Sequence, residues 1–268
     1  MKISIITPTF NSEKTIGKNV NSVINQTYKN YEHIIVDNLS KDGTLKTINE
    51  IYRENNLLNL LKVICDQDEG ISDAFNKGIE SAKGEIVAIL NSDDYYFDYT
   101  VFEKVVDAFS DSNILFTHGN IKFIDNLYGT NIRKPLLCDI IEAMPYNHPT
   151  MFFRREVFNE YGLFDIAYKY AMDYELILRF EKKIKNFHLR GVYLKGEPIT
   201  VQLAGGDSWQ NELASIEEVK KALIQHSFWN AKAEKFFKRR IFRTKLKKWF
   251  GRLKLNFIVK IWRSGKWR

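Results

Sequence analysis

Apolar runs and helix-like segments alternate through the first ninety residues of the chain. The apolar runs cover residues 3–7, 31–37, 60–65 and 85–90, and helix-like patterns lie between them at residues 13–25, 44–55 and 71–82. This alternation is typical of repeated βα units on a mostly parallel sheet. It predicts an α/β fold, with Gly84 well placed to end the third helix.

The second half of the chain is less regular. From about residue 113, strand-like runs cover residues 114–119 and 119–124, and helix-like runs cover residues 154–161 and 173–180. We expect this half to complete the sheet and to build the site for a second substrate.

Polar residues follow each of the four apolar runs. They occupy residues 7–11, 37–40, 66–70 and 91–94, and the last three of these segments contain carboxylates. In open α/β sheets ligands bind beyond the carboxyl ends of the strands. The pattern therefore predicts a binding site at this edge of the sheet.

The acidic tip after the fourth run is a candidate metal site. Asn91, Ser92, Asp93 and Asp94 follow an entirely apolar strand. Mg2+ and Mn2+ prefer oxygen ligands, and one or two carboxylates plus substrate phosphates are their usual partners. An Asx turn that caps a helix starting near Asp98 is the alternative interpretation.

The charge is distributed unevenly. Residues 235–268 hold fourteen Lys and Arg and no Asp or Glu, which leaves 26 basic against 33 acidic residues in the rest of the chain. We therefore expect a catalytic domain at residues 1–215 and a helical, basic, amphipathic extension at residues 216–268.

The extension has an apolar stripe at Phe242, Leu246, Trp249, Leu253 and Phe257, with Lys and Arg mostly off it. This pattern is typical of a helix in a membrane interface, so an anionic membrane surface is the expected partner. A helix packed on the catalytic domain and a nucleic-acid-binding arm are the alternatives. An acidic body is a poor platform for a polyanion, so no nucleic acid is expected.

Cysteine content and hydropathy indicate the compartment. The two cysteines, Cys65 and Cys138, are too few for a disulfide framework, and no stretch approaches the roughly 20 apolar residues of a membrane span. The first residues lack a signal-peptide pattern. We expect a cytoplasmic protein, peripheral on the inner face of the cell membrane.

The chain resembles the family 2 glycosyltransferases of GT-A fold, a Rossmann-like α/β class, and in particular those of bacterial cell-surface polysaccharide synthesis. The matching segments, in order, are residues 7–11 (TPTFN), 22–27 (SVINQT), 35–44 (IVDNLSKDGT), 70–79 (GISDAFNKGI), 84–85 (GE), 90–94 (LNSDD), 148–154 (HPTMFFR), 162–165 (GLFD), 173–176 (DYEL) and 205–208 (GGDS). The resemblance leaves the basic tail uncovered.

The resemblance implies a site for a nucleotide-sugar donor. Pro8, Thr9 and Phe10 line the nucleotide pocket, and Asp37 accepts a hydrogen bond from the base, unless it only caps the following turn. The other implied donor-binding residues are Asn11, Glu13, Gly70, Asn76, Asn91 and Ser92. The metal ligand is Asp93 or Asp94, because Asn91 stands where the family's acidic motif usually begins.

The resemblance also assigns the acceptor side. Asp173 aligns with the family's catalytic base, although it also suits the cap of the helix that follows it. His148 is a weaker acceptor-side candidate. The glycines of residues 205–208 resemble a loop over the donor's diphosphate, and a simple turn explains them equally well.

These features imply an inverting transfer of one sugar, from a donor that we expect to be UDP-linked, to a lipid-linked or oligosaccharide hydroxyl in surface polysaccharide synthesis. The expected cofactor is Mn2+ or Mg2+. Membrane-spanning processive synthases and sugar nucleotidyltransferases fit less well, because their motifs are missing. The alternative is a non-catalytic peripheral membrane or nucleic-acid-binding protein on the same scaffold.

Overall fold

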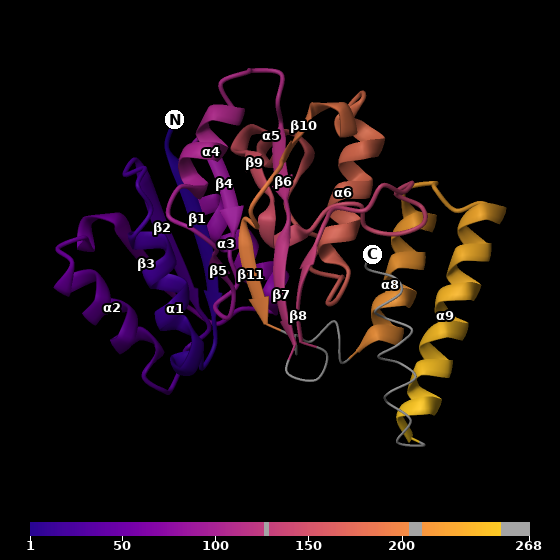
Figure 1. The fold of residues 1–268 in the computed structure, drawn as a ribbon, viewed down its shortest axis with the longest axis horizontal. Helices are drawn as coiled ribbons and strands as arrows, with labels where there is room; N and C mark the ends of the chain where they lie inside the picture. Colours follow the sequence, from indigo (N-terminus) through magenta and orange to yellow (C-terminus); the bar gives the residue numbers. More distant parts are fainter. Residues whose placement is uncertain (126–128, 204–210, 253–268) are drawn as a thin grey trace.

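The computed structural model describes residues 1–125, 129–203 and 211–252 (Figure 1). Its centre is a seven-stranded sheet with the strand order β10-β6-β9-β4-β1-β2-β3. The strands are β1 (Ile3–Thr9), β2 (Tyr31–Asp37), β3 (Leu61–Cys65), β4 (Ile86–Ile89), β6 (Phe116–Gly119), β9 (Phe152–Arg154) and β10 (Gly191–Leu194). The predicted α/β class is confirmed.

The first four strands form the parallel part of this sheet. β1 pairs in parallel with β2 on one side and with β4 on the other, and β2 pairs in parallel with β3. Strands β1, β2 and β4 are almost wholly buried, whereas the edge strand β3 is half-exposed. Their tips therefore lie at one edge of the sheet, as expected.

One strand of the second half runs against the others. β9 lies between β4 and β6 and is antiparallel to both, whereas β10 is parallel to β6. Phe152 and Phe153 of β9 are buried on opposite faces, Phe152 beside Tyr96 and Phe102 and Phe153 beside Phe158 and Phe180. The sheet is thus mostly parallel with one antiparallel insertion.

A second sheet of four short strands packs beside the first. Its order is β5-β11-β7-β8, where β5 is Tyr95–Tyr96, β7 is Ile121–Asp125, β8 is Gly129–Arg133 and β11 is Thr200–Leu203. β6 and β7 correspond to the two strand-like runs expected after residue 113. The small sheet as a unit has no counterpart in the sequence pattern, because β5 and β11 pair only through the tertiary fold.

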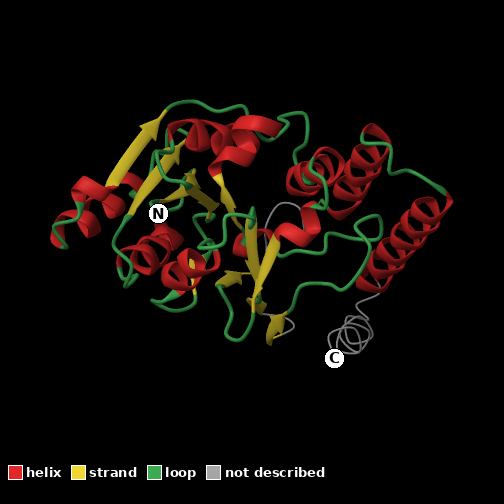
Figure 2. Cartoon of the chain, turned by 90° about the horizontal axis from the view of Figure 1, so that it is seen from above, coloured by secondary structure: helices red, strands yellow, loops and turns green. Residues whose placement is uncertain are grey.

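Helices cover both faces of the large sheet, as Figure 2 shows from above. The helices of the first half are α1 (Glu13–Ile24), α2 (Thr44–Glu54), α3 (Ile71–Ser81) and α4 (Val101–Ala108). α3 packs on β1 and β2, and Gly78 permits this contact because a Cβ at residue 78 would lie 2.3 Å from the Ile6 side chain.

Gly84 has a different role from the expected one. α3 ends at Ser81 with Ala82 as its C-cap, so Gly84 does not end the helix. Its backbone N–H donates to Ser4 Oγ at 2.8 Å, and a Cβ there would lie 2.7 Å from the carbonyl oxygen of Lys2. The glycine instead allows the chain to pass close to β1 before β4 begins.

The last helices reach one side of the molecule, where α8 lies next to α6 and α9 lies next to α8 (Figure 1). They are α5 (Arg155–Tyr161), α6 (Met172–Lys183), α8 (Glu212–Gln225) and α9 (Ala231–Arg252). α8 runs across residue 215, where the predicted boundary lies. None of the helices in the three described ranges is long and apolar enough to cross a membrane.

Candidate donor and acceptor site

Asp37, at the tip of β2, is fully buried and surrounded by donors. Its Oδ1 accepts hydrogen bonds from Thr9 Oγ1 (2.9 Å) and Ser40 Oγ (2.6 Å), and its Oδ2 accepts from the Ser40 backbone N–H (2.9 Å) and the Cys65 thiol (3.6 Å). These partners take up the four acceptor positions of a carboxylate. The geometry favours the turn role of Asp37, and its contact with a base stays a prediction.

Hydrogen bonds join the loop after β1 to the loop after β2. Asn11 has a positive φ of 48°, donates its N–H to Ser40 Oγ at 2.9 Å and accepts from the Lys41 N–H at 2.9 Å. Glu13 is exposed, and its backbone N–H donates to Asp42. Phe10 projects from this pair of loops with 61% of its surface exposed. Of the predicted Pro8, Thr9 and Phe10, only Phe10 therefore offers a large open face.

The tip of β3 reaches the same edge. Asn38 Oδ1 accepts the Asp68 N–H at 3.1 Å, and Asp68 Oδ1 accepts the Gly70 N–H at 2.9 Å. Gly70 has a φ of 120° and open space around its Cα, so the chain can approach a ligand closely here. Burial raises the pKa of Asp68. Asp68 was not among the predicted site residues, although its place after β3 was a signal for it.

Asp93 and Asp94, at the tip of β4, have different surroundings. Asp94 is 1% exposed, and neither of its carboxylate oxygens has a hydrogen-bond partner. Burial, and secondarily the nearby Asp93 carboxylate, raise the pKa of Asp94 well above its usual range, and the neighbouring Asn91 side chain acts in the opposite direction. Asp93 is half-exposed. Of the two carboxylates, only Asp93 is therefore open to a ligand from solvent.

Helix α1 supports the acidic tip from behind. Asn19 Nδ2 donates to the backbone carbonyls of Asn91 (2.8 Å) and Asp94 (3.1 Å), and Ser12 Oγ lies 2.9 Å from Ser92 Oγ. Asn19 was also not predicted. A polar residue between Ile16 and Val20 on the buried face of α1 was the signal for it.

These residues fit a divalent cation that is held jointly with a diphosphate. No cluster of three or more His, Cys, Asp or Glu side chains suited to a metal occurs among the described residues. Asp93 offers a carboxylate, and the buried Oδ1 of Asn91 has no hydrogen-bond partner. One carboxylate completed by substrate phosphates is a usual arrangement for Mg2+ or Mn2+.

Asn76 of α3 binds the backbone of Phe164 through its side-chain amide. Its Nδ2 donates to the Phe164 carbonyl and its Oδ1 accepts the Phe164 N–H, both at 2.9 Å. Both ends of the amide are thus used inside the protein. The contact of Asn76 with the donor stays a prediction, and the geometry gives the residue a supporting role between α3 and the second half.

Asp173 lies in the first turn of α6. It is half-buried, and its Oδ1 accepts the Tyr174 N–H at 2.8 Å. The N-cap position belongs to Ala171, so Asp173 does not cap the helix in the expected way. Within residues 1–125, 129–203 and 211–252, no group donates a hydrogen bond to its second carboxylate oxygen.

His148 is placed near Asp173 by a short 3-10 turn, His148–Thr150. Its ring centre lies 6.1 Å from those of Phe75 and Phe164. Burial lowers the pKa of His148, and the Asp173 carboxylate acts in the opposite direction. The two predicted acceptor-side residues are therefore close enough to interact electrostatically. The predicted loop at residues 205–208 lies outside the described residues.

A family model described as "Glycosyl transferase family 2" matches residues 4–172. The chain belongs to this family. The match covers the tips of β1 to β4 and ends one residue before Asp173. With its mixed sheet and flanking helices, the family 2 chain has the GT-A fold.

Curated relatives match part of the chain. WfgD of Escherichia coli, a UDP-Glc:alpha-D-GlcNAc-diphosphoundecaprenol beta-1,3-glucosyltransferase, is 32% identical over 46% of this chain and 47% of its own length. TuaG of Bacillus subtilis, a putative teichuronic acid biosynthesis glycosyltransferase, is 36% identical over 34% of this chain and 36% of its own. An uncharacterized glycosyltransferase of Haemophilus influenzae is 33% identical over 49% of this chain and 51% of its own. The chain thus spans about half, or less, of these relatives.

Solved structures share the fold over most of the chain. TarS of S. aureus (residues 1–349) superposes with a TM-score of 0.65 and 24% identity, over 93% of this chain and 74% of that one. The mannosyltransferase PcManGT of Pyrobaculum calidifontis, in complex with GDP-Man and Mn2+, has a TM-score of 0.65 and 15% identity, over 88% and 69%. These likenesses support the fold alone.

Proposed function

We propose that the chain is an inverting glycosyltransferase that moves one sugar from a nucleotide-sugar donor to an acceptor hydroxyl. The observation that carries the proposal is the half-exposed Asp93 at the tip of β4, at the same sheet edge as the loops after β1, β2 and β3. Family 2 membership supports the same conclusion.

The nucleotide lies against the loops after β1, β2 and β3. Phe10 offers an exposed aromatic face for the base, and Leu39, 47% exposed, lies in the neighbouring loop. Because the Asp37 carboxylate is occupied, Asn38 and Asp68 are the nearer polar groups for recognition of the base. A UDP-linked donor is supported by WfgD, which is named for UDP-Glc, and by TarS, which was solved with UDP-GlcNAc.

Asp93 holds the divalent cation together with the donor's diphosphate, whereas the amide oxygen of Asn91 is buried like the Asp94 carboxylate. When bound, the cation neutralises the charge that develops on the departing diphosphate. Mn2+ in the complex of PcManGT supports this cofactor. The buried Asp94 is not a ligand and belongs to the support of the loop.

Asp173 is the general base. Displacement at the anomeric carbon requires removal of the proton from the acceptor hydroxyl as the new bond forms, and a carboxylate within hydrogen-bond reach suffices. The bond to the Tyr174 N–H fixes one carboxylate oxygen and leaves the other for the hydroxyl. A single displacement inverts the anomeric configuration.

The acceptor is a lipid-linked or oligosaccharide hydroxyl in surface polysaccharide synthesis, at the inner face of the cell membrane. WfgD, named for a diphosphoundecaprenol-linked acceptor, and TuaG, named for teichuronic acid, support this class. α9 would bring the enzyme to such an acceptor, because Phe242 and Trp249 are exposed on it beside exposed lysines.

The Asp173→Asn variant tests the proposal. We expect it to lower kcat by at least about a hundredfold and to leave the Kd of the donor nearly unchanged, because the base acts on the acceptor. Donors are first found by screening UDP- and GDP-sugars for thermal stabilisation with MnCl2 and with EDTA.

Asp165→Asn is the matched control for this test, since it removes an acidic group from the preceding loop. Transfer by the Asp165 variant should equal that of the wild type. Full transfer by the Asp173 variant, or loss of its donor binding, would contradict the assignment of the base.

A further inference from the structure

Helix α8 lies beyond the part of the chain that matches the family model, yet it contacts the start of α6 (Figure 1). The chain enters α6 through residues 168–171, directly before Met172 and Asp173. No side chain of this entry segment caps the helix. The contacts that hold residues 168–171 in place therefore help to determine the position of Asp173.

Glu218 of α8 binds the backbone of this segment. Its carboxylate accepts hydrogen bonds from three consecutive N–H groups: Lys169 at 3.0 and 3.1 Å, Tyr170 at 2.8 Å and Ala171 at 2.9 Å. Ala171 is the N-cap residue of α6, and a carboxylate at a helix N-terminus is favourably placed. Hydrogen bonds to an ionised acceptor are about twice as strong as neutral ones.

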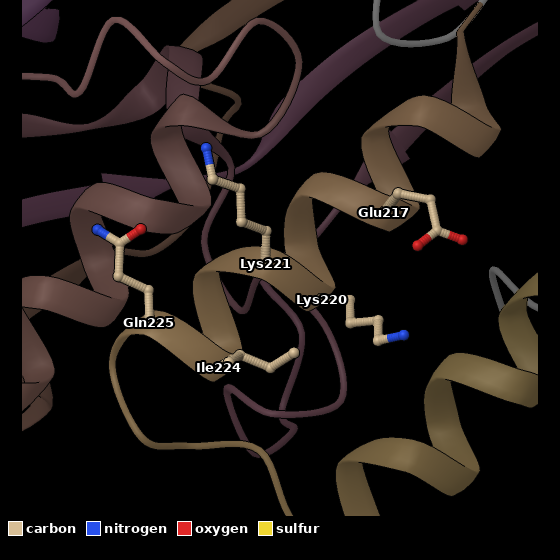
Figure 3. A pocket seen from close by; sticks show the side chains of 5 residues that line it. All are labelled: Glu217, Lys220, Lys221, Ile224 and Gln225. Atoms are coloured by element: carbon tan, nitrogen blue, oxygen red, sulfur yellow. The ribbon is translucent and has the colours of Figure 1, made fainter.

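Two further side chains of α8 hold Tyr168, the first residue of the segment. Gln225 Oε1 accepts the Tyr168 hydroxyl proton at 2.9 Å, and Lys221 Nζ lies 4.3 Å from the centre of the Tyr168 ring. Figure 3 shows Lys221 and Gln225 on one side of α8, and Glu217 pointing away from them. On the other side of the segment, Ser72 of α3 donates to the Tyr168 carbonyl at 3.1 Å.

The C-terminal end of α8 is tied to the first turn of α6. His226 Nε2 lies 2.8 Å from Oε1 of Glu175, which is 1% exposed and also pairs with Arg179 at 3.0 Å. α8 therefore contacts α6 both at its entry and at a residue two positions after Asp173. Such double attachment fixes the direction of the first turn of α6.

We propose that Glu218 is a positioning residue that aligns Asp173 with the acceptor hydroxyl, and that α8 is part of the catalytic unit. This inference rests on the proposed role of Asp173 as the base. A shift of about 1 Å at a reacting group can cost a hundredfold in rate, so three backbone bonds next to Asp173 are worth a measurable part of kcat. The catalytic unit then extends past residue 215 to His226.

Kinetics of Glu218→Ala and Glu218→Gln test the proposal. We expect kcat to fall about 10- to 100-fold in the alanine variant, and less in the glutamine variant, which keeps one acceptor oxygen. The Kd of the donor should stay within about twofold, because Asp173 does not bind it. If Glu218 only stabilised the fold, its substitution would lower kcat and donor binding together. The Glu218→Gln variant would then not recover turnover.

Glu217→Ala is the matched control, since it removes the same charge from the neighbouring, exposed position. It should leave kcat unchanged. Equal losses in the Glu217 and Glu218 variants would overturn the proposal, because a general effect of charge on α8 would then explain both.

Backbone hydrogen exchange tests the contact independently of activity. The amides of Lys169, Tyr170 and Ala171 should exchange faster in Glu218→Ala than in the wild type or in Glu217→Ala. Unchanged exchange would overturn the inference whatever the activity. Faster exchange with an unchanged kcat would overturn it too. If Asp173→Asn keeps full transfer, the proposed base is wrong, while the exchange data still report on the Glu218 contact.

Discussion

Asp93 and Asp94 are neighbours in the chain, but only one of them faces solvent. The backbone turns after β4, so that Asp93 is half-exposed, while Asp94 lies beneath it against Asn19 of α1. A buried carboxylate without hydrogen-bond partners is costly in its ionised form. Substitution of Asp93 and substitution of Asp94 should therefore have very different effects on metal-dependent donor binding.

We expect Asp93→Ala to weaken the binding of UDP in the presence of Mn2+ by about tenfold or more, because a ligand of the cation is lost. Asp94→Asn should leave this affinity within about twofold, since its side chain does not reach solvent. Isothermal titration of UDP with MnCl2, and with EDTA as the metal-free reference, gives both numbers. The reverse order of effects would show that the metal site lies on the Asp94 side.

At this scale the sequence predicts the candidate site only in part. It places Asp37, Asp93, Asp94 and Asp173 at strand ends or helix starts, where the structure has them. It does not show that the Asp37 oxygens are occupied or that Asp94 is buried. Both facts depend on segments distant in sequence, because Thr9 and Cys65 donate to Asp37, and Asn19 donates to the backbone of Asp94.

Among the elements, β1, β2 and α2 are joined by a buried polar chain. His33 is fully buried, with Nε2 at 2.9 Å from Thr7 Oγ1 and Nδ1 at 2.7 Å from Tyr52 Oη. Burial lowers the pKa of His33 to about 3. The imidazole is thus neutral in the folded protein and takes a proton readily only after unfolding.

The stability of the fold should therefore depend on pH through His33. Its pKa is lower in the folded state than the usual 6.5, so the unfolded chain binds more protons between pH 6.5 and about 3. The free energy of unfolding should fall as the pH decreases through this window, by up to about 1.4 kcal/mol per pH unit from this group. Urea titrations at several pH values measure the slope.

His33→Gln should make the slope shallower in this window, even though the variant is less stable at neutral pH. The wild type is the reference, and an identical slope in the two proteins would contradict the assignment to His33.

The longer elements of both halves are predictable from the sequence, α5 and α6 included, whereas the shortest strands are not. β2 spans the expected residues, and α1 to α3 end within one residue of the prediction. Their apolar residues recur over segments long enough to identify a strand or a helix. β5, β9 and β11 have two to four residues each, which is too short for a period. Their conformation follows from pairing with strands far away in the chain.

On the scale of the whole molecule, α9 has one face packed on the body and one open face. Its inner face packs on α8, where Thr244 is buried and its hydroxyl donates to Glu212 at 3.1 Å. Its outer face exposes Phe242 (67%) and Trp249 (54%), with Lys238, Lys245 and Lys248 around them. Packing on the body and contact with a membrane are therefore compatible.

We expect the protein to bind vesicles that contain phosphatidylglycerol and to bind phosphatidylcholine vesicles weakly. Added salt should weaken the binding, since lysines near an anionic surface contribute about 1 kcal/mol each. Phe242→Ser combined with Trp249→Ser should reduce co-sedimentation about tenfold or more, because apolar contact with the interface is lost.

Leu189→Ser is the control for this loss, since Leu189 is as exposed (69%) but lies outside α9. It should co-sediment like the wild type. Equal binding of the double variant would show that α9 is not the contact surface.

The antiparallel insertion of β9 has a consequence for how the protein is made. β4 is the central strand of the large sheet, but its partner β9 begins only at residue 152. The ribosome must therefore synthesise some sixty residues after β4 before β9 exists. Until then, the edge of β4 that pairs with β9 has no partner strand. Open strand edges are templates for aggregation. A nascent chain stalled before residue 152 should thus need a chaperone, and one stalled after the exit of β9 from the ribosome should not.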